Sequence, residues 1–149
     1  MVALRLALFA LLLSPLAACD SGTPETSSFE AALSGDVDRQ ISGAAGIRKD
    51  AEPGTLSFRI EMVQGGFSAE GLTLTSEGLG ITQRGTYELG ITRGGWIGLE
   101  YADGTARYVG EAGTVEITRF RDDYVSGSFS ATLASASSDE TVEVEGRFE

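Results

Sequence analysis

Leu56-Ser57-Phe58-Arg59-Ile60-Glu61-Met62 is the clearest strand pattern in the chain, because apolar and polar residues alternate through it without a break. Successive side chains of a β-strand point to opposite faces of a sheet, so this alternation predicts one buried face and one face in water. After residue 18, no stretch shows the period of a helix. The sequence therefore indicates an all-β protein.

The same alternation recurs on both sides of this run. Upstream it covers residues 29–33 and 37–47, and downstream the apolar residues of 125–133 and of 142–148 each share one face. All such runs together give roughly nine strands with short, glycine-rich connections. We interpret residues 29–149 as one domain, an antiparallel β-sandwich or a flattened barrel.

The last two predicted strands form a hairpin whose register can be derived. Each strand carries a Gly-x-Phe sequence, and a phenylalanine ring can fill the gap that a glycine leaves on the partner strand. The register that achieves this pairs Leu133 with Val142, Ala131 with Val144, Phe129 with Gly146, and Gly127 with Phe148.

Asp103-Gly104 gives the strongest turn signal in the chain, between runs at 96–102 and 105–111. A two-residue turn here places Glu100 opposite Arg107 on the solvent face. Trp96, the only tryptophan, falls on that same face, where an exposed aromatic residue is a candidate contact for a partner. The alternative is a bulge at Gly94-Gly95 that turns the indole into the core, or a half-covered position at the rim.

The N-terminal segment differs from everything after it. Arg5 precedes an unbroken apolar run at residues 6–13, and Ser14-Pro15 leads into Leu16-Ala17-Ala18-Cys19. This run is shorter than the ~20 apolar residues that a membrane-spanning helix needs. The segment has the three parts of an export signal. Cys19 is the only cysteine, so the alternative of an intramolecular disulfide is excluded.

Leu16-Ala17-Ala18-Cys19 resembles the lipobox of bacterial lipoproteins. The resemblance implies that signal peptidase II removes residues 1–18 and that Cys19 then carries fatty acyl chains such as palmitate. Residues 19–28 are polar after the cysteine and would form a flexible tether. The protein would then be held on a lipid bilayer of the bacterial cell envelope, on the periplasmic or the outer face of a membrane.

The C-terminal third carries a second resemblance. The runs Gly113-Thr114-Val115-Glu116-Ile117-Thr118, 125–131 and 142–148 are similar to the same part of uncharacterised bacterial β-sandwich lipoproteins. These residues are structural, so the resemblance implies a fold and brings no known active site.

Composition excludes several kinds of site. The chain has no histidine and a single cysteine, so neither a Ser-His-Asp triad nor a zinc site of imidazole or thiolate ligands can form. Without residues 1–18 it has ten basic and 22 acidic residues, a net charge of −12. Such a charge disfavours nucleic acid as a partner, and also disfavours lying flat on anionic lipid. We expect no cofactor.

Two functional classes remain. The first is a non-catalytic binding or interaction module whose partner is an envelope protein, a glycan or a small ligand. The second is a carboxylate- and calcium-dependent enzyme, or an accessory subunit of an envelope complex. Asp36-Val37-Asp38 has the first spacing of a calcium loop, and Asp122-Asp123 is a further acidic pair, but the glycine and later carboxylate of an EF-hand are absent.

Overall fold

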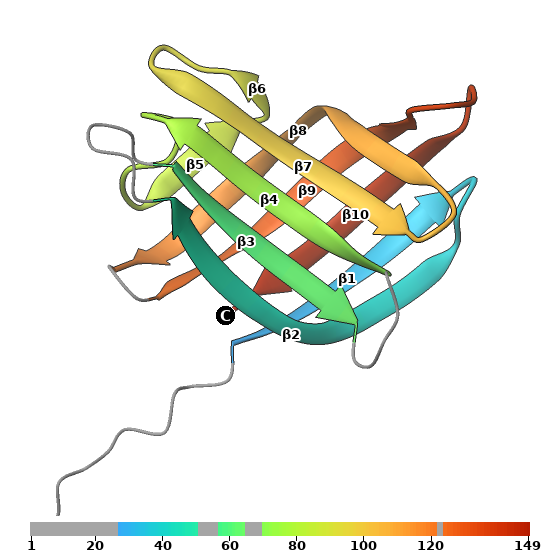
Figure 1. The fold of residues 1–149 in the computed structure, drawn as a ribbon, viewed down its shortest axis with the longest axis horizontal. Helices are drawn as coiled ribbons and strands as arrows, with labels where there is room; N and C mark the ends of the chain where they lie inside the picture. The colour runs from blue at the N-terminus through green and yellow to red at the C-terminus, as the bar shows by residue number, and fades with distance from the viewer. Residues whose placement is uncertain (1–26, 51–56, 65–69, 122–123) are drawn as a thin grey trace, which may run out of the picture.

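The computed structural model describes residues 27–50, 57–64, 70–121 and 124–149. Within these ranges it contains ten antiparallel β-strands and no helix, which confirms the predicted all-β class. The strands are β1 (Ser28–Gly35), β2 (Arg39–Asp50), β3 (Ser57–Gln64), β4 (Glu70–Gly78), β5 (Gly85–Glu88), β6 (Gly90–Ile91), β7 (Gly95–Asp103), β8 (Arg107–Phe120), β9 (Val125–Ser135) and β10 (Thr141–Phe148) (Figure 1). A search of these residues for a helix able to cross a membrane finds none.

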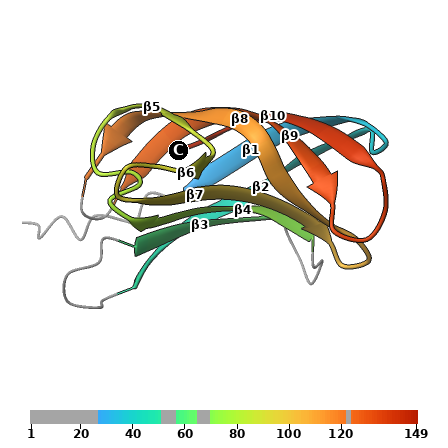
Figure 2. The same cartoon turned by 90° about the horizontal axis from the view of Figure 1, so that it is seen from above.

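Eight of the strands close into a ring. Its order is β1, β2, β3, β4, β7, β8, β9 and β10, and β10 pairs again with β1. β5 pairs with β8, and β6 with β7, outside this ring. The ring is flattened into two layers, with β2, β3, β4 and β7 on one side and β1, β8, β9 and β10 on the other (Figure 2). Of the two predicted architectures, the structure has the barrel.

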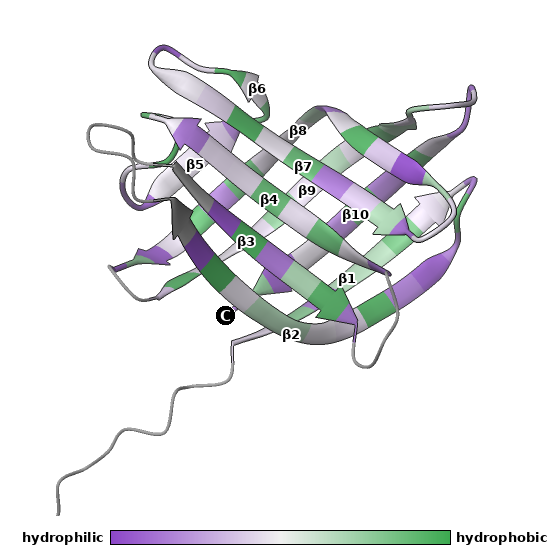
Figure 3. Cartoon of the chain, viewed as in Figure 1, coloured by the Kyte–Doolittle hydropathy of each residue, from purple (hydrophilic) through white to green (hydrophobic). Residues whose placement is uncertain are grey.

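Alternation along each strand sorts its side chains between the interior and the outer surface (Figure 3). In β3, Ile60 and Met62 are buried and Arg59 is exposed, as the alternating run predicts. Leu56 lies outside the described residues. All eight strands of the ring contribute apolar side chains to one continuous core. This core fills the barrel and leaves the polar residues of every strand on the outside.

The last hairpin has the predicted register. Leu133 lies opposite Val142, Phe129 opposite Gly146, and Gly127 opposite Phe148. A Cβ atom on Gly146 would lie 2.5 Å from Cζ of Phe129, and one on Gly127 would lie 3.1 Å from Cζ of Phe148. The two rings stack with centroids 6.3 Å apart. Each ring therefore occupies the space that a glycine leaves free.

The predicted register of the β7–β8 hairpin is wrong by two residues. Tyr101 lies opposite Tyr108, and Ala102 opposite Arg107. The Asp103 carboxylate accepts hydrogen bonds from the backbone N–H groups of Thr105 and Ala106, at 2.9 and 2.8 Å, and so stabilises a longer turn. Because a shift of two residues preserves the faces, Glu100 and Arg107 still meet outside the barrel, with Oε2 2.6 Å from Nη2.

β8 is one long strand where the sequence indicates two runs, because it continues through bulges after Gly110 and after Ile117. Beyond Val109 it separates from β7, and β5 and β6 pair with the separated edges. Leu89 lies between them, and a Cβ atom on Gly110 would lie 3.0 Å from its Cδ1. The β4–β7 connection at 79–94 thus fills the opening in the wall.

The antiparallel order places alternate connections at opposite ends of the barrel. The terminal end carries Ser27, where the described chain begins, together with Glu149, the 79–94 connection and Arg121. The turn end carries the turns at 36–38, 104–106 and 136–140.

Candidate functional site

The predicted calcium ligands are only partly within the described residues. Asp122 and Asp123 lie outside them, as does Cys19. Asp36 is engaged in the fold, because its Oδ2 accepts a hydrogen bond from the backbone N–H of Thr141 at 2.7 Å. Asp38 is exposed. Among the described residues, no three carboxylate, imidazole or thiol side chains gather in a group that could hold a metal ion.

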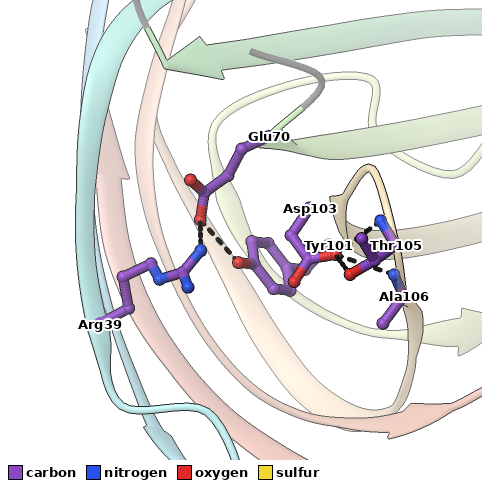
Figure 4. Close-up of polar contacts among 6 residues, drawn as sticks. All are labelled: Arg39, Glu70, Tyr101, Asp103, Thr105 and Ala106. Carbon is purple, nitrogen blue, oxygen red and sulfur yellow. Dashed lines mark hydrogen bonds and ion pairs between the residues drawn. The ribbon is translucent and has the colours of Figure 1, made fainter.

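Glu70 is the centre of a polar cluster at the turn end (Figure 4). Its Oε1 accepts hydrogen bonds from Nη1 of Arg39 and from the hydroxyl of Tyr101, both at 2.7 Å. Tyr101 is fully buried. Burial, followed by the hydrogen bond to Glu70, raises the pKa of Tyr101 above its usual value, so the phenol stays protonated and acts as a donor. The cluster stabilises the barrel and offers no nucleophile or base.

A second set of bonds fixes the neighbouring turns. Asp103 accepts from Thr105 and Ala106, and these bonds hold the pKa of Asp103 below its ordinary value. The rings of Tyr101 and Tyr108 stack 5.9 Å apart. The hydroxyl of Tyr108 donates to Oε2 of Glu140 at 3.2 Å. The polar groups of the turn end are thus used to join one strand to another.

Trp96 lies on the outer face of β7, opposite Ile91 of β6 and Glu77 of β4. The regular β4–β7 pairing shows no bulge that would turn the indole inward. The ring instead lies over Gly98, where a Cβ atom would be 2.0 Å from Cη2 of Trp96. The residue is 37% exposed. Its position is therefore half covered, on the outside of the barrel.

Trp96 has exposed apolar neighbours. Ile91, its cross-strand partner, is 93% exposed, and Leu79 is 61% exposed. Leu79 borders the strand before Trp96, because a Cβ atom on Gly94 would lie 2.8 Å from the Leu79 Cβ. We call Leu79, Ile91 and Trp96 the terminal-end patch. It holds three of the five large apolar residues that are exposed in the described chain; Val63 and Val109 are the others.

A shallow trough of about 750 Å³ lies on the outer face of β5, β8, β9, β10, β1 and β2. Two cross-strand rows run along it, and short side chains line its middle. The first row is Thr86, Glu116, Ser128, Arg147, Glu30 and Ser42. The second is Glu88, Thr114, Ser130, Glu145, Ala32 and Gln40. We call this surface the outer trough.

The outer trough is polar and acidic. Arg147 is paired with Glu30, with Nε 2.9 Å from Oε1, whereas Glu116 and Glu145 make no ion pair with a described residue. Hydroxyl groups of Thr114, Ser128 and Ser130 lie between these carboxylates. The surface can therefore accept and donate hydrogen bonds along a hollow that crosses six strands.

Sequence reasoning missed both the Glu70 cluster and the outer trough. The pattern placed Tyr101 on the buried face, and a buried tyrosine hydroxyl needs a partner. That partner is 31 residues away, as is Arg39 from Glu70. A scan against protein families and searches of curated proteins and of solved structures found no match to this chain.

Proposed function

We propose that the protein is a lipid-anchored lipoprotein of the bacterial cell envelope, whose barrel is a non-catalytic interaction module. The anchor is Cys19, in the lipobox-like sequence Leu16-Ala17-Ala18-Cys19. Residues 1–18 are a signal peptide that is removed, and 19–28 are the lipidated cysteine and its tether. The full chain should partition into detergent with acyl chains on Cys19, and Cys19→Ser should abolish both. An unmodified Cys19 at the mature terminus would contradict the anchor.

The outer trough is the observation that supports an interaction module. Ligand sites usually have volumes of about 300–1,000 Å³ and are mainly apolar. The trough has a volume of this size, but its lining consists of hydroxyl and carboxylate groups on a broad sheet face. Such a surface suits an extended partner with hydroxyl or basic groups better than a compact apolar ligand. We propose an envelope protein or a glycan as that partner.

Site-specific cross-linking in intact cells tests this role. A photoreactive residue at Ser130 samples the trough, and one at Thr73, on the outer face of β4, is the matched control. We expect a discrete adduct from position 130 only, and mass spectrometry would show whether it contains a peptide or a glycan. Equal labelling at both positions, or none at either, would contradict the proposed binding face.

The second candidate function, a carboxylate- and calcium-dependent enzyme or accessory subunit, makes a different prediction. A ligand at a hundred times its Kd stabilises a protein by about 2.7 kcal/mol. Saturating calcium would therefore raise the melting temperature of such a protein measurably. The interaction module that we propose should melt at the same temperature with calcium and with a chelator.

A further inference from the structure

Charged side chains are unevenly distributed between the two ends of the barrel. The turn end has more carboxylates than arginines. Its carboxylates are Asp36, Asp38, Glu70, Asp103, Asp139 and Glu140, and its arginines are Arg39 and Arg107. Both arginines are paired, with Glu70 and Glu100. The strong negative charge of the chain therefore has a local excess at the turn end.

The terminal end has the opposite character. Five exposed arginines make no ion pair or side-chain hydrogen bond with any described residue, and all of them lie at or near this end. They are Arg59, Arg84, Arg93, Arg119 and Arg121. Arg84 and Arg93 belong to the 79–94 connection, which also carries Leu79 and Ile91 of the terminal-end patch. The nearby carboxylates are Glu77 and Glu88.

This combination has a preferred environment. Tryptophan and isoleucine side chains gain from leaving water, and the indole N–H favours the boundary between lipid and water. Arginine can extend its guanidinium to lipid phosphates while its stem stays on apolar surface. Exposed apolar patches of this kind mark protein or membrane contacts. Unpaired arginines beside the patch favour an anionic lipid surface.

The chain path brings this end toward the bilayer if the proposed anchor is correct. The described chain begins at Ser27, at the terminal end. Eight residues separate Cys19 from Ser28, and fully extended they reach about 28 Å. The carboxylates of the turn end lie roughly 30 Å further away, the length of a nine-residue strand such as β7. Salt screens charges beyond about 8 Å, so those carboxylates do not prevent contact.

We propose that the terminal-end patch, with Arg84 and Arg93, docks on the anionic surface of the bilayer that holds Cys19. This orients the barrel with its turn end away from the membrane. The inference rests on the proposed lipid anchor, but it does not depend on what the outer trough binds. Near an anionic surface, two arginines change the ratio of docked to undocked protein by about 30-fold.

Trp96 is the only tryptophan, so its fluorescence reports docking directly. The full-length lipidated protein is placed in phosphatidylcholine vesicles with or without one-quarter phosphatidylglycerol, with doxyl-labelled lipid as quencher. We expect a blue shift and quenching with phosphatidylglycerol, both reduced by high salt. Arg84→Gln with Arg93→Gln should reduce the quenching. Arg107→Gln with Ser137→Glu, which changes the net charge equally at the turn end, should not.

Each alternative has its own result. Absence of lipid quenching, or quenching that is independent of phosphatidylglycerol and of the two arginines, would overturn the proposed docking. A blue shift without lipid quenching would mean that protein, either a second copy or a partner, covers the indole, and would also overturn it. Failure of the anchor is distinguishable, because the chain would then lack acyl mass and would not remain with the vesicles.

Discussion

The turn end and the terminal end of the barrel are built from the same eight strands, but their charged side chains have different partners. At the turn end, Glu70 accepts hydrogen bonds from Arg39 and Tyr101, and Asp103 accepts them from its own turn. At the terminal end, Arg84 and Arg93 have no described partner, and exposed apolar side chains lie beside them. Charges that are already paired stabilise the fold, whereas unpaired ones remain available for another molecule.

The comparison also shows which clusters point to function. The Glu70 cluster has the look of a site, since it joins an acid, a base and a phenol around one oxygen atom. All its donors are satisfied, and no buried side-chain polar atom of the described residues lacks a partner. A cluster so completely bonded needs no ligand to explain it.

The largest effect should come from the core that the two ends share. Phe129→Ala removes a buried ring that packs on Gly146 and stacks with Phe148. We expect it to cost about 3–5 kcal/mol in the free energy of unfolding, measured with denaturant. A cost below about 1 kcal/mol, as for a surface residue, would place Phe129 outside the core.

The next effect should distinguish the two ends. Glu70→Ala leaves the hydroxyl of Tyr101 and the guanidinium of Arg39 without their acceptor, and we expect a loss of about 2 kcal/mol. Glu77→Ala is the matched change at the terminal end, where the carboxylate is exposed, and should stay within about 0.5 kcal/mol. Equal losses in the two variants would remove the contrast between the ends.

A smaller, pH-dependent effect should follow from Asp103. Its pKa is lowered in the folded state, so its contribution is present above the ordinary value of 3.8 and is lost as the pH falls below it. We expect Asp103→Ala to cost about 1 kcal/mol at pH 7 and progressively less toward pH 3. Asp139→Ala, also at the turn end, should show no such dependence. A constant cost for Asp103→Ala would mean that its carboxylate is not the cap.

The smallest effect on stability should occur beneath the indole. A methyl group at Gly98 would meet Cη2 of Trp96 at 2.0 Å, so the ring must swing outward. Gly98→Ala should therefore shift the emission of the soluble folded domain to longer wavelength and increase iodide quenching. Gly46→Ala is the control, because its Cβ atom would meet nothing within 4 Å. Unchanged emission in Gly98→Ala would show that the ring does not lie over this glycine.

The sequence was sufficient where local patterns determine structure. The β9–β10 register could be predicted because two Gly-x-Phe runs restrict it to one arrangement. The β7–β8 register could not, because the outcome depends on three donors that reach one carboxylate, Asp103. The faces remained correct because the error was an even number of residues.

Closure of the barrel lay beyond local patterns. The ring depends on pairing of β1 with β10 and of β4 with β7, which are distant in the chain. The terminal-end patch was only half predicted for a similar reason. Trp96 was a candidate from its face in the strand, but Ile91 lies in a glycine-rich connection and became its neighbour only when β6 paired with β7.

The most direct test of the account compares the distance of each end from the bilayer. Single cysteines are introduced at Thr82 in the terminal end or at Ser137 in the turn end, and are labelled with a fluorescent donor in the lipidated protein, where Cys19 is blocked. Energy transfer is then measured to acceptor lipids in phosphatidylglycerol-containing vesicles. We expect much stronger transfer from position 82 than from position 137, with the difference reduced by Arg84→Gln with Arg93→Gln. Equal transfer from both positions, or stronger transfer from position 137, would contradict it.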